Sequence, residues 1–262
     1  MDLVDRVVVV TGGGNGIGEA MCRRFSSQGA SVAVVDLDRD AARRVAGEVG
    51  GLWYGADVAS ETDTRAVVAE VEDRLGPIDL YCANAGIGME GGVETPDSDW
   101  QRIWEINFMS HVYAARAVLP GMLARGEGYL LHTASAAGLL TNLGAAAYSV
   151  TKHAVVALAE WLQITYGDRG LRVSALCPQF VFTELLDDLL PAGMKTMARQ
   201  VGLSPDQVAE AVCEGLAAES FLILPHPEVS EYFANKATDY DRWLQGMRRL
   251  QSRLRIEVPS PL

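Results

Sequence analysis

Long hydrophobic runs are absent from the sequence. No stretch approaches the ~20 uninterrupted apolar residues of a membrane-spanning helix, so we expect no membrane partner. The N-terminal segment, MDLVDRVVVVTGG, lacks a basic region followed by a long apolar run, which predicts a cytoplasmic location rather than secretion. Internal repeats and low-complexity tracts are also missing. The 262 residues fit one α/β domain, and we expect a single domain over residues 1–262.

Positive charge and cysteine are both scarce. The 22 Lys and Arg residues stand against 34 Asp and Glu, and the net charge of -12 argues against a nucleic-acid-binding face. The four cysteines, Cys22, Cys82, Cys177 and Cys213, lie far apart and lack the spacing of a zinc site or a disulfide framework. We therefore expect no metal. The 49% of hydrophobic and 21% of charged residues are ordinary for a soluble globular enzyme.

A glycine-rich loop joins a predicted strand to a predicted helix. Residues 6–11 (RVVVVT) form a β-branched run without polar alternation, which is typical of a strand buried on both faces. The loop TGGGNGIG follows with the spacing Gly12-x-x-x-Gly16-x-Gly18, and the next amphipathic segment ends at Gly29. Small residues let the backbone approach a pyrophosphate, and free amides at a helix N-terminus favour its charge. We expect a phosphate site, with a merely flexible loop as the alternative.

A carboxylate ends the second predicted strand, residues 31–36 (SVAVVD). In a βαβ unit, Asp36 would reach the adenosine ribose and accept hydrogen bonds from its 2′ and 3′ hydroxyls. The same charge would repel a 2′-phosphate. Neither Asn15 in the glycine loop nor Leu37 after the carboxylate is basic, so the sequence favours NAD over NADP. The alternative is that Asp36 only terminates a strand at the surface.

Two further strand ends are predicted beside the same cleft. Residues 51–57 (GLWYGAD) form the third strand, whose end would lie near the adenine ring, and a helix over 61–75 follows. The fourth strand, residues 78–85, ends in an amide side chain and a tight turn. Strand ends at the switch point of an α/β sheet are where ligands bind. The residues expected at these two ends are Asp57, Val58, Asn84, Ala85 and Gly86.

A polar amide interrupts the apolar helical region predicted over 97–123. Asn107 stands within WEINFMSHVYAARAVL, and a buried amide must satisfy its donors and acceptors. His111 follows one turn later. It either shares the face of Asn107 or is a packed residue at a helix interface.

A Tyr and a Lys four residues apart lie on a predicted helix over 145–161, which contains neither Gly nor Pro. Tyr148 and Lys152 therefore share a face, and the ammonium would favour the phenolate that a general base requires. An unperturbed Tyr titrates near pH ~10, so a pKa near 7 needs on the order of 4 kcal/mol, which one ammonium and one cationic cofactor ring could supply. The alternative is an ordinary helix face with a solvated Lys. Ser135 ends the preceding predicted strand, 128–135.

The last third of the chain contains two more predicted strands, 171–178 and 221–224. Residues 184–201 between them are rich in Leu and Met and broken by Pro and Gly, which favours a variable lid or, equally, a helix pair that covers the core. A helix is predicted from Ser204 to about Ala218, because Pro occupies its first position. An amphipathic helix over 236–253 would pack on its own core or on a neighbouring subunit.

Taken in order, these motifs resemble those of the short-chain dehydrogenase/reductase family, in its single-domain type of about 250 residues. The resemblance runs from Val4 to roughly Pro225. It implies an α/β fold, a Rossmann-like doubly wound parallel sheet of about seven strands, with which the strands predicted above agree. The motifs that carry it are TGGGNGIG at 11–18, Asp36, Asp57-Val58, Asn84-Ala85-Gly86, Asn107, Ser135, Tyr148-x-x-x-Lys152 and Pro178 with Val181 and Thr183.

The resemblance implies catalytic roles for four residues. Tyr148 would exchange a proton with the substrate oxygen, and Lys152 would lower its pKa and hold the nicotinamide ribose. Ser135 would hydrogen-bond the substrate oxygen as charge develops on it. Asn107 would anchor a water that links Lys152 to solvent.

The resemblance also implies the binding residues. The backbone near Val181 and the Thr183 hydroxyl would fix the cofactor carboxamide. The expected cofactor site comprises Gly12, Asn15, Gly16, Ile17, Gly18, Asp36, Leu37, Asp57, Val58, Asn84, Ala85, Gly86, Tyr148, Lys152, Pro178, Val181 and Thr183. The expected substrate site comprises Ser135, Leu143, Tyr148, Gln179, Leu185 and Leu186, with Leu139, Leu140, Leu189 and Met194 as further apolar lining.

Two departures from the family pattern stand out. Gln179 replaces the usual Gly after Pro178, which would stiffen the loop or turn an amide toward the substrate. His226-Pro227-Glu228 replaces the terminal Asp-Gly-Gly of many members, so the path of the C-terminal extension over 226–262, and any tetramer contact built around it, does not follow from the resemblance.

These observations favour an NAD-dependent oxidoreductase that transfers a hydride between NAD and a secondary alcohol or ketone of a fairly apolar substrate. The expected partners are a small-molecule substrate and further copies of the chain, as a homotetramer or a dimer. Two alternatives share the motifs: a catalytically idle NAD-binding sensor or assembly subunit, and a dehydrogenase acting on a C–C or C–N bond.

Overall fold

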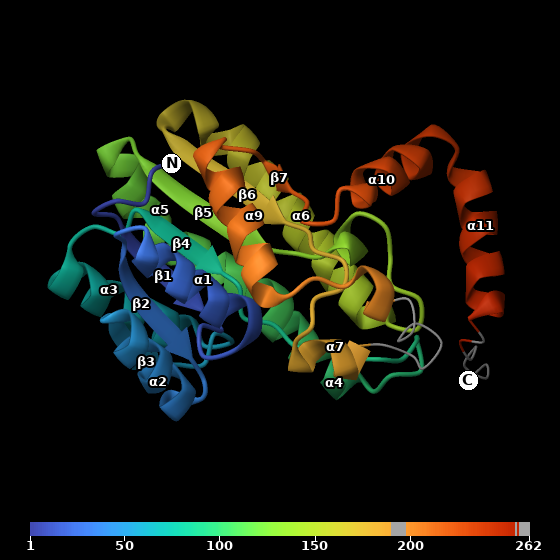
Figure 1. Cartoon of the computed structure of the whole chain (residues 1–262), viewed down its shortest axis with the longest axis horizontal. Helices are drawn as coiled ribbons and strands as arrows, with labels where there is room; N and C mark the ends of the chain where they lie inside the picture. The colour runs from blue at the N-terminus through green and yellow to red at the C-terminus, as the bar shows by residue number, and fades with distance from the viewer. Residues whose placement is uncertain (190–197, 255, 257–262) are drawn as a thin grey trace.

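The protein folds into one parallel sheet with helices on both faces (Figure 1). The structure is a computed structural model that describes residues 1–189, 198–254 and 256. Its seven strands pair in the order β3-β2-β1-β4-β5-β6-β7, all in parallel, which confirms the predicted doubly wound sheet. The strands are β1 (Val7–Thr11), β2 (Ser31–Asp36), β3 (Leu52–Gly55), β4 (Leu80–Ala83), β5 (Gly128–Thr133), β6 (Leu171–Leu176) and β7 (Leu222–Ile223).

The strand order reverses between β1 and β4. Strands β2 and β3 lie on one side of β1, and β4 to β7 lie on the other. In such sheets the crevice outside the carboxyl ends of the strands at the reversal is where ligands bind. The loops that follow these strands therefore hold the candidate site.

The helices form two layers around the sheet. One layer consists of α3 (Glu61–Leu75), α5 (Ser110–Arg125) and α6 (Ala146–Tyr166). The other consists of α1 (Gly16–Ser27), α2 (Arg39–Val49) and α9 (Pro205–Ala217). Further helices are α4 (Asp97–Trp104), α7 (Glu184–Leu189), α10 (Glu228–Thr238) and α11 (Tyr240–Arg253), of which α11 lies farthest from the sheet in Figure 1. None of the helices that the structure describes is long and apolar enough to cross a lipid bilayer.

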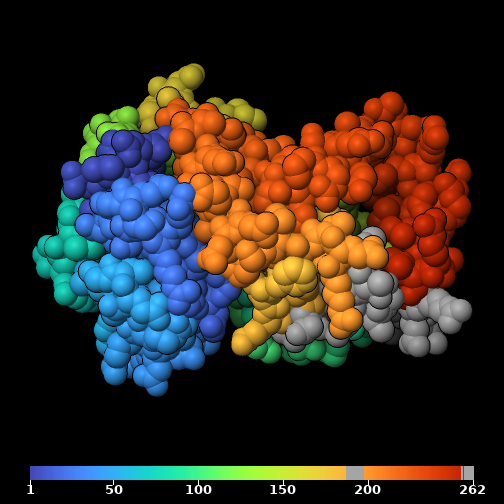
Figure 2. All heavy atoms as spheres, viewed as in Figure 1, coloured from blue at the N-terminus to red at the C-terminus, as the bar shows by residue number. Residues whose placement is uncertain are grey.

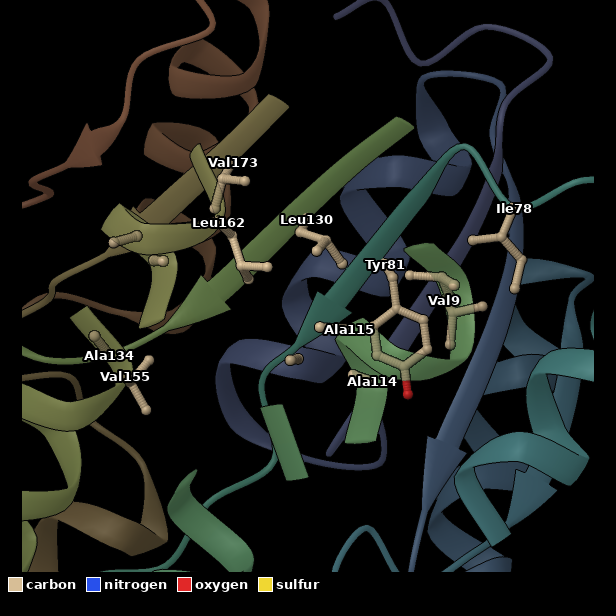
Figure 3. Packing of buried hydrophobic residues seen from close by; sticks show 14 of the residues in the cluster. Val9, Ile78, Tyr81, Ala114, Ala115, Leu130, Ala134, Val155, Leu162 and Val173 are labelled. Carbon is tan, nitrogen blue, oxygen red and sulfur yellow. The ribbon is translucent and has the colours of Figure 1, made fainter. Parts of the chain in front are cut away.

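Strand β1 shows how one segment serves both layers. Val7 and Val9 belong to the hydrophobic cluster under α3, α5 and α6, whereas Val8 and Val10 belong to the cluster under α1, α2 and α9. Side chains of a strand alternate between the two faces, so a run of valines supplies apolar surface to both. Figure 3 shows Val9 in the first cluster, beside Tyr81.

Several predicted boundaries are wrong by a few residues. Strand β5 ends at Thr133, so Ser135 lies in the following loop, and the third strand covers only Leu52–Gly55. Helix α6 continues beyond the predicted end to Tyr166, and a π-helical turn over Glu105–Met109 divides the predicted 97–123 helix. Helix α2, which the Asp38 side chain caps, was not predicted.

The C-terminal extension differs most from the prediction. The helix predicted over about 236–253 corresponds to α11, which begins at Tyr240, whereas α10 before it was not predicted; the two helices meet at Asp239. The Asp239 carboxylate accepts a hydrogen bond from the Arg242 amide at 3.0 Å, so it caps α11 as a new helix. The predicted lid begins with α7, but residues 190–197 lie outside the described residues, and the lid stays a prediction.

Candidate active site

The glycine loop lies at the carboxyl end of β1 and leads into α1. Gly12 and Gly16 have φ angles of 63° and 54°, which favour glycine. A Cβ on Gly12 would lie 2.9 Å from the Ala85 backbone, and one on Gly18 would collide with the carbonyl oxygen of Gly12. Asn15 precedes α1 in an extended conformation without a side-chain cap, which leaves the first amides of the helix for an anion. This cradle fits a dinucleotide phosphate.

Asp36 is held next to this loop at the end of β2. Its Oδ2 accepts a hydrogen bond from the Gly14 amide at 2.9 Å, and its Oδ1 accepts one from the Asp38 amide at 3.0 Å. The next residue, Leu37, is 73% exposed. The carboxylate is therefore fixed where β2 ends, beside the amides of the glycine loop, as a ribose ligand requires.

The predicted adenine contacts lie in the loop after β3. Asp57 is exposed, and its carboxylate accepts a hydrogen bond from the Ala59 amide at 2.9 Å. Its own amide donates to the Asp63 carboxylate at 3.2 Å, which ties the loop to the start of α3. Val58 beside it is half-buried. Ile17 of α1 packs at the edge of the second cluster.

Asn84 joins three strand ends at the switch point. Its Nδ2 donates to the Thr11 carbonyl oxygen at 2.9 Å, and its Oδ1 accepts from the Thr133 hydroxyl at 3.0 Å. A Cβ on Gly86, just beyond, would lie 3.2 Å from Asn107 Oδ1 and 3.5 Å from Lys152 Nζ. The small residue thus lets the backbone after β4 pass close to two of the predicted catalytic side chains.

Asn107 is fully buried in the π-helical turn between α4 and α5. Its Nδ2 donates to the Ile87 carbonyl oxygen at 2.9 Å, and its Oδ1 accepts from the Ile87 amide at 2.8 Å. The buried amide therefore has the partners that it needs. The π-helical turn, which sequence periodicity does not reveal, is typical of functional sites.

Ser135, Tyr148 and Lys152 lie close together just beyond the carboxyl end of β5. Ser135 Oγ accepts from the Ala137 amide at 3.1 Å. Tyr148 lies in the first turn of α6, and Lys152 Nζ lies 5.7 Å from the centroid of its ring. The ammonium donates to the Thr133 carbonyl oxygen at 2.9 Å. The alternative of a solvated Lys is wrong, because Lys152 is 3% exposed and Tyr148 is 6% exposed.

Burial dominates the electrostatics of this pair in the protein alone. Burial raises the pKa of Tyr148 to about 12, although the hydrogen bond with the Ser135 hydroxyl lowers it in part. Burial also lowers the pKa of Lys152 to about 8. The lysine therefore does not by itself bring the phenol toward neutrality. The second positive charge that the sequence argument invoked, that of a cofactor ring, stays a prediction.

The loop after β6 returns to the glycine loop. A Cβ on Gly16 would lie 3.0 Å from Thr183 Cγ2, so the two loops lie close together. The Thr183 amide donates to the Val181 carbonyl oxygen at 2.8 Å. Pro178, at the start of this loop, accepts a hydrogen bond from the Ala136 amide at 2.8 Å.

The predicted apolar substrate residues and Gln179 do not all lie in one place. Leu143 and Gln179 line a cleft of about 730 Å³ beside the C-terminal helices. Leu185 instead packs against the cluster that contains Tyr148. Leu186 packs with Leu143 in a separate cluster. Of the further lining residues, Leu140 lines the same cleft, Leu139 is buried in the main core, and Met194 and the Leu189 side chain lie outside the described part of the chain.

A pair of buried histidines lies outside the predicted site, and one of the two, His132, was not expected from the sequence. His111 Nδ1 and His132 Nδ1 lie 2.9 Å apart, and both rings are fully buried between α5 and β5. His111 is thus the packed interface residue that one of the two interpretations expected. The signal for His132 was a lone His within the apolar strand GYLLHT. Burial lowers the pKa of His132 to about 4 and shifts that of His111 in the same direction.

The fold and the crevice define a Rossmann-type α/β protein with a Ser, Tyr and Lys at the switch point. Residues 6–192 match the family model described as short chain dehydrogenase. The protein therefore belongs to the short chain dehydrogenase family and is an oxidoreductase.

Individual relatives agree with this assignment. The chain is 37% identical over 238 residues to 1-deoxy-11-beta-hydroxypentalenate dehydrogenase of Streptomyces exfoliatus, covering 87% of this chain and 86% of the relative. It is 36% identical over 185 residues to meso-2,3-butanediol dehydrogenase of Serratia marcescens, covering 69% and 73%. A short chain dehydrogenase/reductase of Burkholderia phymatum, solved in complex with NAD, superposes with a TM-score of 0.80 at 26% identity and covers 100% of this chain and 99% of that one.

Proposed function

We propose that the protein is a single-domain, NAD-dependent dehydrogenase that transfers a hydride between NAD and a secondary alcohol or ketone of a fairly apolar substrate. The observation that carries the proposal is the grouping of Ser135, Tyr148 and Lys152 beside a crevice lined by Gly12 and Gly18. The names of the relatives support it, because pentalenate and butanediol dehydrogenases act on hydroxylated compounds. The NAD complex of the Burkholderia protein supports the choice of cofactor.

Each catalytic residue has one task in this reaction. Tyr148 removes the proton of the alcohol, or returns it to the ketone in the reverse direction. Ser135 donates a hydrogen bond to the substrate oxygen as charge develops there. Lys152 is largely protonated at neutral pH, since its pKa is about 8, and its charge favours the phenolate. NAD, when bound, supplies the hydride acceptor. Asn107 Oδ1 and Lys152 Nζ both face Gly86, and Asn107 anchors a water that links Lys152 to solvent, so that the proton can leave.

Asp36 selects NAD in this proposal. The carboxylate at the end of β2 accepts hydrogen bonds from the ribose hydroxyls and repels a 2′-phosphate. Leu37, the next residue, offers no positive charge that could compensate. The residues implied for the carboxamide, Val181 and Thr183, lie on the loop that faces Gly16.

The test is a screen of secondary alcohols with NAD and NADP, using wild type and Tyr148→Phe. The wild type should oxidise at least one alcohol with a preference for NAD, and the variant should lose about 100-fold or more in kcat, because proton transfer by a positioned side chain contributes at least that much. Tyr166→Phe, at the far end of the same helix, is the matched control. Oxidation by Tyr148→Phe at the wild-type rate would remove the phenol from the mechanism, and a preference for NADP would overturn the role of Asp36.

The proposed assembly is a homotetramer or a dimer. Helix α6 carries an apolar stripe at helical spacing that faces away from the core: Val150 is 47% exposed, Trp161 55% and Ile164 83%. An apolar stripe of this kind is typical of a surface that another copy covers. The cytoplasmic location stays a prediction from the sequence.

A further inference from the structure

The two departures from the family pattern, at Gln179 and at 226–228, are joined to each other. The Gln179 amide donates to His226 Nδ1 at 3.1 Å, and His226 Nε2 lies 3.1 Å from the Phe180 carbonyl oxygen. The imidazole is 2% exposed and bridges two consecutive peptide groups in the loop after β6. Helix α10 follows His226, and with α11 it forms the right-hand flank of the molecule in Figure 2.

These two contacts fix the position of the proton on the neutral ring. A carbonyl oxygen only accepts, so Nε2 of His226 must carry the hydrogen that points at Phe180. Nδ1 must then be without a proton, because it accepts from the Gln179 amide. Uptake of a second proton would place an N–H at Nδ1 against the N–H of Gln179, and this hydrogen bond would be lost. Only the neutral ring makes both contacts.

Gln179 lies between the catalytic loop and the residues implied for the cofactor. Pro178, directly before it, accepts a hydrogen bond from the Ala136 amide at 2.8 Å. Val181 and Thr183, which follow, are the residues that the resemblance assigns to the carboxamide, and Thr183 lies close to the glycine loop. The peptide that the imidazole holds is therefore part of the path that places Val181 and Thr183.

Phe180 has attachments besides the imidazole. Its carbonyl oxygen also accepts from the Leu203 amide at 2.9 Å, and its side chain is buried in a cluster with Ile256, which lies beyond α11. The Gln179 amide, by contrast, donates to His226. Loss of the imidazole contact should therefore free Gln179 while Phe180 stays in place, which displaces the start of the loop without unfolding the protein.

The surroundings of the ring favour its neutral form. Burial lowers the pKa of His226, whereas the Glu228 carboxylate in the first turn of α10 and the backbone of Phe180 and Val201 raise it less strongly. The pKa lies below the ~6.5 of a free histidine, so the ring is neutral at pH 7. Among the residues that the structure describes, Glu228 is the charged group that acts on the ring, and the loop after β6 contributes only backbone groups.

We propose that His226 is a positioning residue for cofactor binding, whose neutral ring holds the start of the loop after β6 in the shape that receives the nicotinamide end of NAD. Protonation of the ring breaks the hydrogen bond with the Gln179 amide, and NAD then binds more weakly. The inference rests on the proposed NAD-dependent function. It adds a residue that controls the cofactor loop and, with it, a loss of affinity for NAD in mild acid.

Calorimetric titration with NAD, in steps from pH ~7.5 to pH ~5, tests the proposal in the wild type and in two variants. The wild type should bind NAD about tenfold more weakly at the lower end, because a hydrogen bond that orders the loop is lost. His226→Leu offers Gln179 no acceptor and should bind this weakly at every pH. His226→Asn keeps an acceptor and does not titrate, so its affinity should stay within about threefold of that of the neutral wild type.

Glu228→Gln separates the titration of His226 from a structural effect of substitution. Removal of the carboxylate lowers the pKa of the ring further, so the loss of NAD affinity should begin at a lower pH than in the wild type. Glu231→Gln, at an exposed position on the same helix, is the matched control. It should keep the wild-type pH dependence.

The outcomes separate this inference from the proposed function. An NAD affinity of the wild type that does not change with pH, or wild-type affinity in His226→Leu, would overturn the role of His226 and leave the NAD-dependent function intact. No binding of NAD by the wild type at any pH would count against the proposed function. Hydrogen exchange over residues 179–183 without NAD then decides the role of His226 alone: faster exchange in His226→Leu than in His226→Asn supports it, and equal exchange refutes it.

Discussion

Gly18 lies in the crevice at a position that has no room for a side chain. An added Cβ would collide with the carbonyl oxygen of Gly12 and would lie 2.8 Å from Asn84 Nδ2. We expect Gly18→Ala to lower the free energy of unfolding by about 1–3 kcal/mol, because the loop must shift, and to weaken NAD binding. Thermal denaturation and calorimetric titration with NAD measure the two effects.

Gly47 provides the matched control for that substitution. It lies within α2, and an added Cβ would have no atom within 4 Å. Gly47→Ala should therefore stabilise the protein by roughly 0.5–1 kcal/mol, since alanine is the better helix former, and leave NAD binding unchanged. Wild-type affinity for NAD in Gly18→Ala would show that the close approach is not needed for binding.

The buried pair of His111 and His132 predicts a loss of stability in mild acid. In the unfolded chain a His takes up a proton near pH ~6.5, whereas burial lowers the pKa of His132 to about 4. Between these values the unfolded state binds more protons, so this contribution is present above pH ~6.5 and is lost as the pH falls toward 4, by about 3 kcal/mol at most.

Urea unfolding at pH 7 and pH 5 measures this effect. His132→Phe should flatten the dependence of the free energy of unfolding on pH, whatever its effect on stability at pH 7. His153→Gln, on the partly buried face of α6 and outside the pair, is the control and should keep the wild-type slope. Equal slopes for wild type and His132→Phe would contradict the assignment.

At the scale of elements, one lysine joins the C-terminal helices to the loop after β5. Lys236 donates hydrogen bonds to the carbonyl oxygens of Leu139 and Leu140. We expect Lys236→Met to lower the free energy of unfolding by about 1–3 kcal/mol, because buried acceptors lose their partner. Hydrogen exchange should become faster in α10 and α11 than in α6.

Glu231, which is exposed on the same helix α10, provides the comparison. Glu231→Ala should leave both the free energy of unfolding and the exchange pattern close to those of the wild type. Unchanged exchange in α11 of Lys236→Met would mean that Ile256 alone holds the extension in place.

At the scale of the whole molecule, the apolar stripe of α6 predicts association. In the proposed oligomer Trp161, which is 55% exposed in the single chain, is covered by another copy. Trp161→Asp should therefore shift the mass measured by light scattering after size-exclusion chromatography toward the monomer. Val93→Asp, at an isolated apolar residue that is 81% exposed, should not. A wild type that is already monomeric would refute the proposed oligomer.

Much of the architecture followed from local patterns. The β-branched run at 6–11 predicted a strand buried on both faces, and Val7 to Val10 divide between the two clusters as that pattern requires. Helix boundaries followed less closely from the sequence. At Asp239, for example, α10 ends and α11 begins because the Asp239 carboxylate caps the first amides of α11. The π-helical turn at Asn107 leaves no trace in the periodicity of the apolar residues.

The sequence by itself determined the order of the motifs and, through their resemblance to the short-chain dehydrogenase/reductase family, the parallel sheet and the residues that meet at the carboxyl ends of its strands. Only the tertiary structure decided how deeply Tyr148 and Lys152 are buried, and hence that their pKa values shift to about 12 and about 8. It also decided that the C-terminal helices form one wall of a cleft. Burial and cavities depend on how distant segments pack together, which no short stretch of sequence encodes.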